Sequence, residues 1–209
     1  MRETAVGAVL IGSLCLFSCS QKSTPSNSSG SSSTESTPVA SASPPTFTVC
    51  SGTYALCTTA KCTFISGVDP STPKLSCECD VKQGYSAGAK SCTEVPQPPA
   101  KAGDSIPSRY YPITSMAVCS NARPWASCLD APCTVEPGLS KARCICDQVS
   151  TPTQSYVVVT NSYNGSTCRS DIWSSATVQA VIQITGFLQD SQQLKASPIT
   201  IVGVGAAKE

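Results

Sequence analysis

The sequence predicts a small disulfide-rich protein of mostly β and irregular structure, made of two tandem six-cysteine modules at residues 47–93 and 117–209. The second module is enlarged by a C-terminal extension, either α or β. Two observations lead to this fold class: the 209-residue chain contains 14 cysteines, and six of them recur in the same order with the same neighbours. Each module has few large apolar residues, so its core needs covalent cross-links to be stable.

The duplication extends beyond the cysteines. Both copies open with Val-Cys-Ser, continue through an aromatic-Ala pair and an Ala-x-Cys-Thr segment, and close on Cys-x-Cys-Asp before a last cysteine. We expect the equivalent aromatic residues Tyr54 and Trp125 to pack on a disulfide, and Asp80 and Asp147 to form turns. The repeated cysteines are Cys50, Cys57, Cys62, Cys77, Cys79 and Cys92 in the first module, and Cys119, Cys128, Cys133, Cys144, Cys146 and Cys168 in the second.

The N-terminal segment carries features of an exported protein. Residues 5–17 form an apolar stretch after Arg2, shorter than the roughly 20 apolar residues that span a bilayer. We therefore expect a signal peptide at residues 1–18. The stretch ends in Leu16-Phe17-Ser18-Cys19, which resembles the lipobox of bacterial lipoproteins. The resemblance implies that Cys19 carries a diacylglyceryl group with acyl chains such as palmitate, and Ser20 resembles lipoproteins sorted to the outer membrane.

The segment that follows is expected to be a tether. Residues 19–46 consist almost entirely of Ser, Thr, Pro, Gly, Ala and Asn. Such a composition buries too little apolar surface to offset the entropy of ordering, so we expect disorder. A flexible chain of this length spans roughly 30 Å, which holds a folded part clear of a lipid surface.

The cysteine count favours disulfides over metal binding. Without Cys15 in the signal peptide and the lipid-carrying Cys19, twelve of the 14 cysteines remain, an even number for each module. Zinc bound by cysteines is the alternative, since Cys57 and Cys62 have a spacing found in zinc sites. Six thiols do not divide into one four-ligand site, and Cys-x-Cys is too closely spaced, so we expect six disulfides and no metal.

The order Cys, Cys, Cys, Cys-x-Cys, Cys, with Gly84-Tyr85 after the first Cys-x-Cys, resembles the EGF-like family. An unrelated bacterial cysteine-rich module is the alternative. The resemblance implies small β-hairpins and a pairing of first with third, second with fourth, and fifth with sixth cysteine. The implied disulfides are Cys50–Cys62, Cys57–Cys77, Cys79–Cys92, Cys119–Cys133, Cys128–Cys144 and Cys146–Cys168.

Residues 94–116 join the modules and are rich in proline. The run Pro96-Gln97-Pro98-Pro99 favours extended polyproline conformation, so we expect a semi-rigid spacer. Arg109-Tyr110-Tyr111 could instead pack as a strand that leads into the second module.

The second module contains additional elements. Residues 155–160 predict a strand, and Tyr163-Asn164-Gly165-Ser166 predicts a hairpin turn. For residues 176–194 the pattern leaves helix and strand open, because apolar residues recur at helical spacing but also alternate and are often β-branched. Residues 198–204 predict a final strand.

Composition excludes several classes of function. Charged residues make up 13% of the chain and the net charge is +1, which argues against a nucleic-acid partner. The chain has no histidine, which removes the commonest general base and metal ligand. We expect no catalytic residues, no cofactor and no metal.

Two functional hypotheses remain. The first is a non-catalytic lipoprotein, anchored to a bacterial membrane, whose modules bind a protein or glycan of the cell envelope or serve a structural role. The second is a thiol-redox or other enzyme that uses the Cys-x-Cys pairs, Cys77/Cys79 or Cys144/Cys146.

Overall fold

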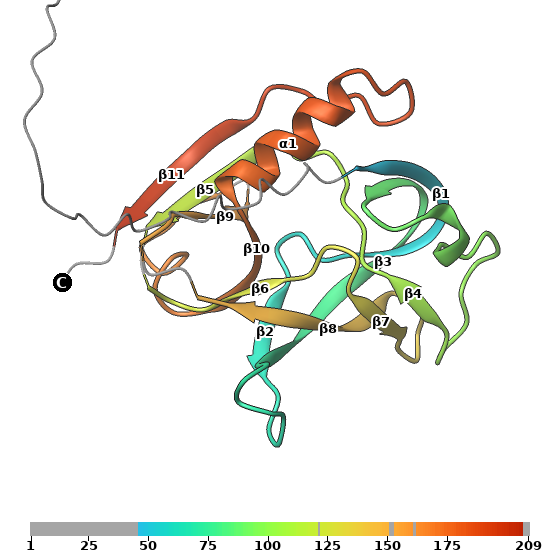
Figure 1. The fold of residues 1–209 in the computed structure, drawn as a ribbon, viewed down its shortest axis with the longest axis horizontal. Helices are drawn as coiled ribbons and strands as arrows, with labels where there is room; N and C mark the ends of the chain where they lie inside the picture. Colours follow the sequence, from blue (N-terminus) through green and yellow to red (C-terminus); the bar gives the residue numbers. More distant parts are fainter. Residues whose placement is uncertain (1–45, 121, 151–152, 161, 207–209) are drawn as a thin grey trace, which may run out of the picture. The chain divides into compact units, whose positions relative to one another are not determined.

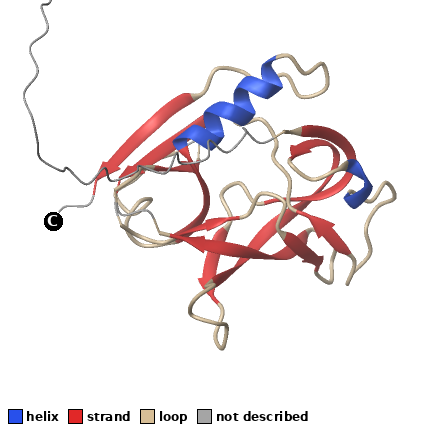
Figure 2. Cartoon of the chain, viewed as in Figure 1, coloured by secondary structure: helices blue, strands red, loops and turns tan. Residues whose placement is uncertain are grey.

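The computed structural model describes residues 46–206 except 121, 151–152 and 161. These residues form strands with one α-helix and a short 3-10 helix (Figures 1 and 2), which confirms the predicted disulfide-rich, mostly β class. The elements are β1 (Thr48–Leu56), β2 (Lys61–Phe64), β3 (Lys74–Gly88), η1 (Cys92–Glu94), β4 (Ser105–Pro107), β5 (Ser115–Ser120), β6 (Trp125–Ser127), β7 (Pro132–Val135), β8 (Lys141–Val149), β9 (Tyr156–Val159), β10 (Ile172–Thr177), α1 (Val178–Gln189) and β11 (Thr200–Ala206).

Five of the strands close into a ring. β10 pairs with β2, β2 with β3, β3 with β8, β8 with β6, and β6 again with β10. Successive side chains of a strand point to opposite faces, so Leu75, Cys77 and Cys79 of β3 turn inward together. Cys144 and Cys146 of β8 do the same, and all five side chains are buried. The interior of the ring is therefore a core built largely of cystine.

The two modules face each other across β3 and β8. The strands are antiparallel and centred on the pair Cys77 and Cys144, which are equivalent cysteines of the repeat. Lys74 lies opposite Asp147, and Asp80 lies opposite Lys141. Each lysine thus meets the aspartate of the other copy, as in an isologous dimer, where residue i contacts j and j contacts i.

The same reciprocity holds inside the core. Cys57 Sγ lies 3.5 Å from Cys144 Sγ, and its equivalent Cys128 Sγ lies 3.5 Å from Cys77 Sγ. The two modules are therefore not independently packed domains, because each contributes half of one pseudo-symmetric core.

The disulfides are nested within each module, so the pairing implied by the EGF-like resemblance is wrong. The sixth, fifth and fourth cysteines pair with the first, second and third, giving Cys50–Cys92, Cys57–Cys79, Cys62–Cys77, Cys119–Cys168, Cys128–Cys146 and Cys133–Cys144. The physical reason is the strand register, because Cys50 lies opposite Ser86, nine residues along β3 from Cys77. Cys62 lies directly opposite Cys77 on the neighbouring strand, far from Cys50.

The Asp residues after Cys-x-Cys do not form turns, contrary to expectation. Asp80 lies in β3 and Asp147 in β8. Asp80 accepts a hydrogen bond from Lys141 at 2.8 Å, and Lys74 donates to Asp147. Both aspartates therefore pair with a lysine on the neighbouring strand and do not bond to their own backbone as turn residues would.

The proline-rich segment 94–116 does not act as a spacer. β4 pairs with β7, and Ile106 is buried in the cystine core. Ser108 and Tyr110 form β-bridges with Ala55 and Ala87, so the stretch from 109 packs against the first module. Buried side chains hold this segment against the modules, although its proline content alone favours an isolated extended chain.

The additional elements of the second module form a layer beside the ring. β9 pairs with β10 and with β5, and β11 pairs with β5, which confirms the strands predicted at 155–160 and 198–204. The predicted turn is present within a longer connection, where Asn164 Oδ1 accepts a hydrogen bond from Ser166 N at 2.9 Å.

The segment left open between helix and strand forms α1. Thr177 caps the helix by accepting a hydrogen bond from Ala180 N. The buried side chains Val181, Ile184 and Leu188 recur at helical spacing on one face. Val181 packs with Val157 of β9, and Ile184 and Leu188 pack with Phe47 before β1.

Candidate functional site: an apolar cavity beneath the helix

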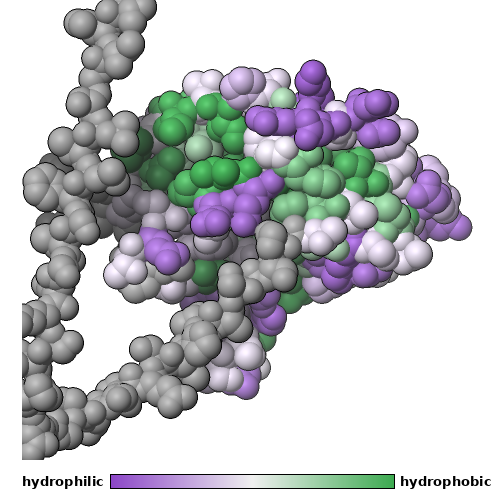
Figure 3. All heavy atoms as spheres, turned by 45° about the horizontal axis from the view of Figure 1, so that its top comes forward, coloured by the Kyte–Doolittle hydropathy of each residue, from purple (hydrophilic) through white to green (hydrophobic). Residues whose placement is uncertain are grey.

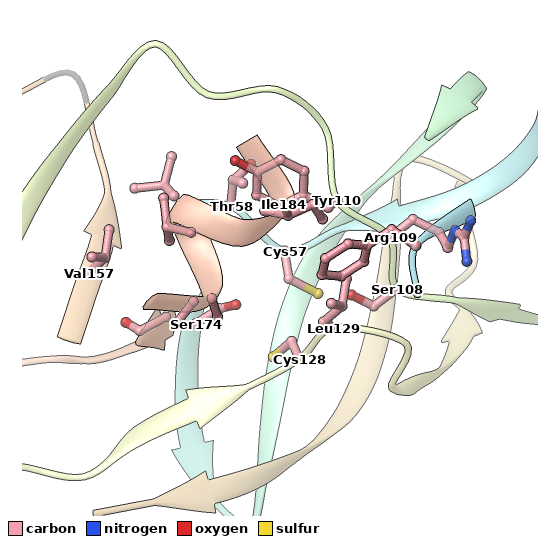
Figure 4. A pocket seen from close by; sticks show the side chains of 16 residues that line it. Cys57, Thr58, Ser108, Arg109, Tyr110, Cys128, Leu129, Val157, Ser174 and Ile184 are labelled. Atoms are coloured by element: carbon pink, nitrogen blue, oxygen red, sulfur yellow. The ribbon is translucent and has the colours of Figure 1, made fainter. Parts of the chain in front are cut away.

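An apolar cavity lies between α1 and the cystine core (Figure 4). It encloses about 100 Å³, and its walls come from α1, β9, β10, residues 108–110 and the turns that follow β1 and β6. Apolar side chains and two half-cystines make up most of the lining, among them Val157, Val181, Ile184, Leu129, Cys57 and Cys128. Both modules and the C-terminal extension are needed to form it.

A few polar groups line the same cavity. The hydroxyl residues Thr58, Ser108 and Ser174 contribute to its wall, and Ser108 and Ser174 are themselves buried. The Tyr110 hydroxyl lies 3.5 Å from Thr185 Oγ1. Burial raises the pKa of the Tyr110 hydroxyl.

Among the described residues that line the cavity, only Arg109 is charged, and Figure 4 shows its guanidinium turned away from the other side chains. The side chain is fully buried. Its Nη1 atom donates to Lys90 O at 3.0 Å and Asp130 Oδ1 at 3.1 Å, and its Nη2 atom donates to Thr48 O at 2.9 Å. The charge is thus neutralised outside the cavity, which remains an uncharged apolar space.

The size of the cavity limits what it can hold. A cavity of roughly 150 Å³ lined by aliphatic and aromatic side chains binds benzene or xenon. A space of about 100 Å³ therefore admits one small apolar group, such as a short alkyl chain or a branched side chain. Leu129, which lines the cavity, is 43% exposed, so this part of the wall reaches the surface of the protein.

The surface beyond the cavity is also partly apolar. Figure 3, with the side of α1 and β11 turned forward, shows apolar side chains gathered there. Ile182 of α1 and Ile201 and Val204 of β11 are all more than half exposed.

A second, larger hollow lies on the outer face of the ring and is polar. Its charged residues already pair with neighbours: Lys141 with Glu78 at 3.5 Å, Arg143 with Glu136 at 2.8 Å, and Lys61 with Asp171 at 3.0 Å. A ligand would compete with these exposed pairs for their charges. The apolar cavity, whose lining has no such competition, is the stronger candidate for a binding site.

The cysteines expected in disulfides are all cross-linked, including those considered for redox chemistry. Cys77 and Cys79 belong to different disulfides and are at most 1% exposed. Thiol chemistry needs an accessible sulfur, so this geometry gives the Cys-x-Cys redox hypothesis no support.

Two groups of three sulfurs lie within 4.8 Å of one another, Cys57/Cys133/Cys144 and the equivalent Cys62/Cys77/Cys128. In the structure every one of these sulfurs belongs to a disulfide. A zinc ligand must be a thiolate, so the arrangement is that of packed cystines and not of a metal centre.

Sequence reasoning found the cysteines and Trp125, which packs with the Cys119–Cys168 disulfide as expected. Tyr54 is buried, and burial raises its pKa to about 12. The sequence did not predict the residues that line the cavity, nor the buried hydrogen bonds by which Arg109 joins Thr48, Lys90 and Asp130. The only signal for Arg109 was the strand tendency of residues 109–111. The predicted lipid attachment site Cys19 and the tether to residue 45 lie outside the described residues.

Comparison with known proteins finds no match for this chain among family models, curated proteins or solved structures. Within the described part of the chain, no helix has the length and apolar character needed to cross a membrane.

Proposed function

We propose that this protein is a non-catalytic, lipid-anchored binding protein of a bacterial cell envelope, and that the cavity beneath α1 receives an apolar group of its ligand. The observation that carries the proposal is the concave, mostly apolar cavity, because concave apolar sites with a few polar groups are the usual form of ligand pockets. The lipobox-like motif at residues 16–19 and the tether expected at residues 19–46 support the lipid-anchored location.

The chemistry of the lining favours one of the ligand classes expected from the sequence. A glycan needs many polar partners, whereas apolar side chains and half-cystines make up most of these walls and only a few hydroxyl groups interrupt them. The site therefore suits an apolar side chain of a protein partner or the end of an acyl chain. The rest of such a ligand would lie on the apolar surface near α1.

Disulfides keep the cavity formed in the absence of ligand. Cys57 and Cys128 in its wall are cross-linked to Cys79 of β3 and Cys146 of β8. A preformed site loses little conformational freedom on binding, which favours affinity.

Titration of residues 20–209 with the short-chain alcohols butanol and hexanol, followed by amide NMR, tests the cavity. We expect saturable shifts centred on Val157, Ala176 and Val181, with a dissociation constant of about 1 mM, or ~4 kcal/mol. Ala180→Phe places a ring in the cavity and should abolish the shifts. Gln179→Phe, on the exposed side of the same helix turn, should leave them unchanged. Equal shifts in both variants would contradict the proposal.

The anchor is tested in a bacterial host by labelling with an alkyne analogue of palmitate. We expect the full-length chain to be labelled and to sediment with outer membranes, and Cys19→Ala to lose both properties. An unlabelled, freely released protein would rule out the lipid-anchored form of the function while leaving the cavity experiment valid.

A further inference from the structure

One disulfide differs from the other five in its exposure. Of the twelve half-cystines, eleven are buried and only Cys92, in η1, is exposed. Its partner Cys50 is buried at 2% exposure. A disulfide is attacked from the side that a thiol can reach, so in Cys50–Cys92 the exposed residue Cys92 is the open side and the buried residue Cys50 the protected side.

The equivalent disulfide of the second module provides an internal comparison. Cys119 and Cys168 are exposed by 0% and 3%, and they pack in a cluster with Trp125 and Tyr156. A Cβ atom added to Gly205 of β11 would lie 2.7 Å from Cys168 Sγ, so that strand lies close against the sulfur. The duplication has therefore produced one covered and one open copy of the same bond.

A buried cation faces the protected sulfur of the open copy. Arg109 Nη2 lies 3.2 Å from Cys50 Sγ, and the guanidinium is held there by Thr48 O, Lys90 O and Asp130 Oδ1. A neighbouring arginine stabilises a thiolate, and a stabilised thiolate is the better leaving group in thiol–disulfide exchange. Arg109 therefore has two effects: it holds its own segment to the first module, and it favours departure of the Cys50 thiolate.

We propose that Cys50–Cys92 is a thiol-exchange site that reacts with an external thiol or dithiol at Cys92. The attacking thiolate forms a bond to Cys92 Sγ, the Cys50–Cys92 bond breaks, and its electron pair passes to Cys50, which leaves as a thiolate beside Arg109. A second thiolate of a dithiol then attacks the mixed disulfide and releases Cys92. The dithiol is oxidised to a disulfide, and the protein is reduced by the same two electrons.

The charges around the two sulfurs predict opposite effects for two variants. Asp130 is the counter-ion of Arg109, while Lys90 and Glu94 beside Cys92 form an exposed pair of their own at 3.0 Å. Arg109→Met removes the cation and should disfavour the Cys50 thiolate. Asp130→Asn leaves the cation unneutralised and should favour it. Both variants break the same ion pair, so a merely structural effect would move both in one direction.

The first experiment uses the oxidised protein, residues 20–209, without substitution. Limiting dithiothreitol is followed by alkylation and peptide mass mapping at timed intervals. We expect Cys50 and Cys92 to be labelled at least about tenfold faster than the matched control pair Cys119 and Cys168, given their difference in access. Equal rates, or faster opening of any other disulfide, would overturn the proposal.

The second experiment uses the variant Cys92→Ser, in which Cys50 is a free thiol. The fraction of Cys50 present as thiolate is measured by ultraviolet absorbance, a method in which no reagent has to reach the buried sulfur. An ordinary cysteine is only a few per cent thiolate at pH 7, and we expect a several-fold larger fraction here. Adding Arg109→Met should reduce this fraction and adding Asp130→Asn should increase it. An ordinary fraction, or a change of the same sign in both, would refute the role of Arg109.

Discussion

Arg109 joins three segments that are distant in the sequence: the start of β1, the residues just after β3 and the turn that carries Asp130. Its side chain is fully buried, and that of Asp130 is 10% exposed. A Cβ atom on Gly88 would lie 2.4 Å from both Arg109 Nη1 and Asp130 Oδ1, so glycine is needed where the pair passes β3. No local sequence pattern predicts this set of contacts around Arg109, because its partners Thr48, Lys90 and Asp130 come together only in the folded chain.

Arg109→Met should therefore lower the free energy of unfolding by about 3–5 kcal/mol, since it leaves the Asp130 carboxylate buried without its cation. Arg143→Met removes an arginine whose side chain is 66% exposed and should cost less than about 1 kcal/mol. Urea unfolding with disulfides intact measures both values. A similar small cost for the two variants would show that the buried pair contributes little.

The ladder between the modules also makes a residue-level prediction about pH. A hydrogen bond from Lys141 lowers the pKa of Asp80. A carboxyl group with a lowered folded-state pKa adds stability above its unfolded value, near 3.9, and loses it as pH falls through the folded value. Lys141→Met should therefore flatten the loss of stability below about pH 4 and raise the pKa of Asp80, as measured by carboxyl NMR. Lys61→Met, whose partner is Asp171, should leave the Asp80 titration unchanged.

For single elements, the sequence was sufficient for the strands β9 and β11 and insufficient for α1. Residues 155–160 and 198–204 had both β-propensity and flanking turn residues. The segment that becomes α1 has β-branched residues that favour a strand, and tertiary packing decides between the two. Val181, Ile184 and Leu188 can all be buried at once only when the segment is helical, against β9 and the residues around Phe47.

Two glycines near this layer should respond in opposite ways to alanine. Gly186 lies inside α1 with open space around it, so Gly186→Ala should stabilise the protein by up to about 1 kcal/mol through helix propensity. A Cβ atom on Gly203 would lie 2.1 Å from the Tyr163 ring, so Gly203→Ala should cost about 1–3 kcal/mol by overpacking. Thermal unfolding measures both. A stabilising Gly203→Ala would mean that β11 does not pack on Tyr163.

At the scale of the whole molecule, the duplication was readable from the sequence but its consequence was not. The repeated Lys and Asp around Cys-x-Cys gave no hint that each copy pairs with the other. The nested disulfides follow from the same geometry, since Cys-x-Cys places both sulfurs on one face of a strand, and the two preceding cysteine-bearing segments of each module lie beside that strand. The EGF-like resemblance used the order of cysteines alone, which does not contain the strand register.

Because the two halves share one core, a defect in the first module should destabilise the second. Leu75 lies in β3 opposite Cys146 of β8 and is completely buried. Leu75→Ala should lower the free energy of unfolding by about 2–5 kcal/mol. We expect hydrogen exchange in moderate denaturant to show equal loss of protection at the amides of β3 and of β8. Phe64→Ala, which removes a side chain that is 62% exposed in the same module, should change neither. Loss of protection confined to residues 47–93 would show instead that the modules unfold as independent units.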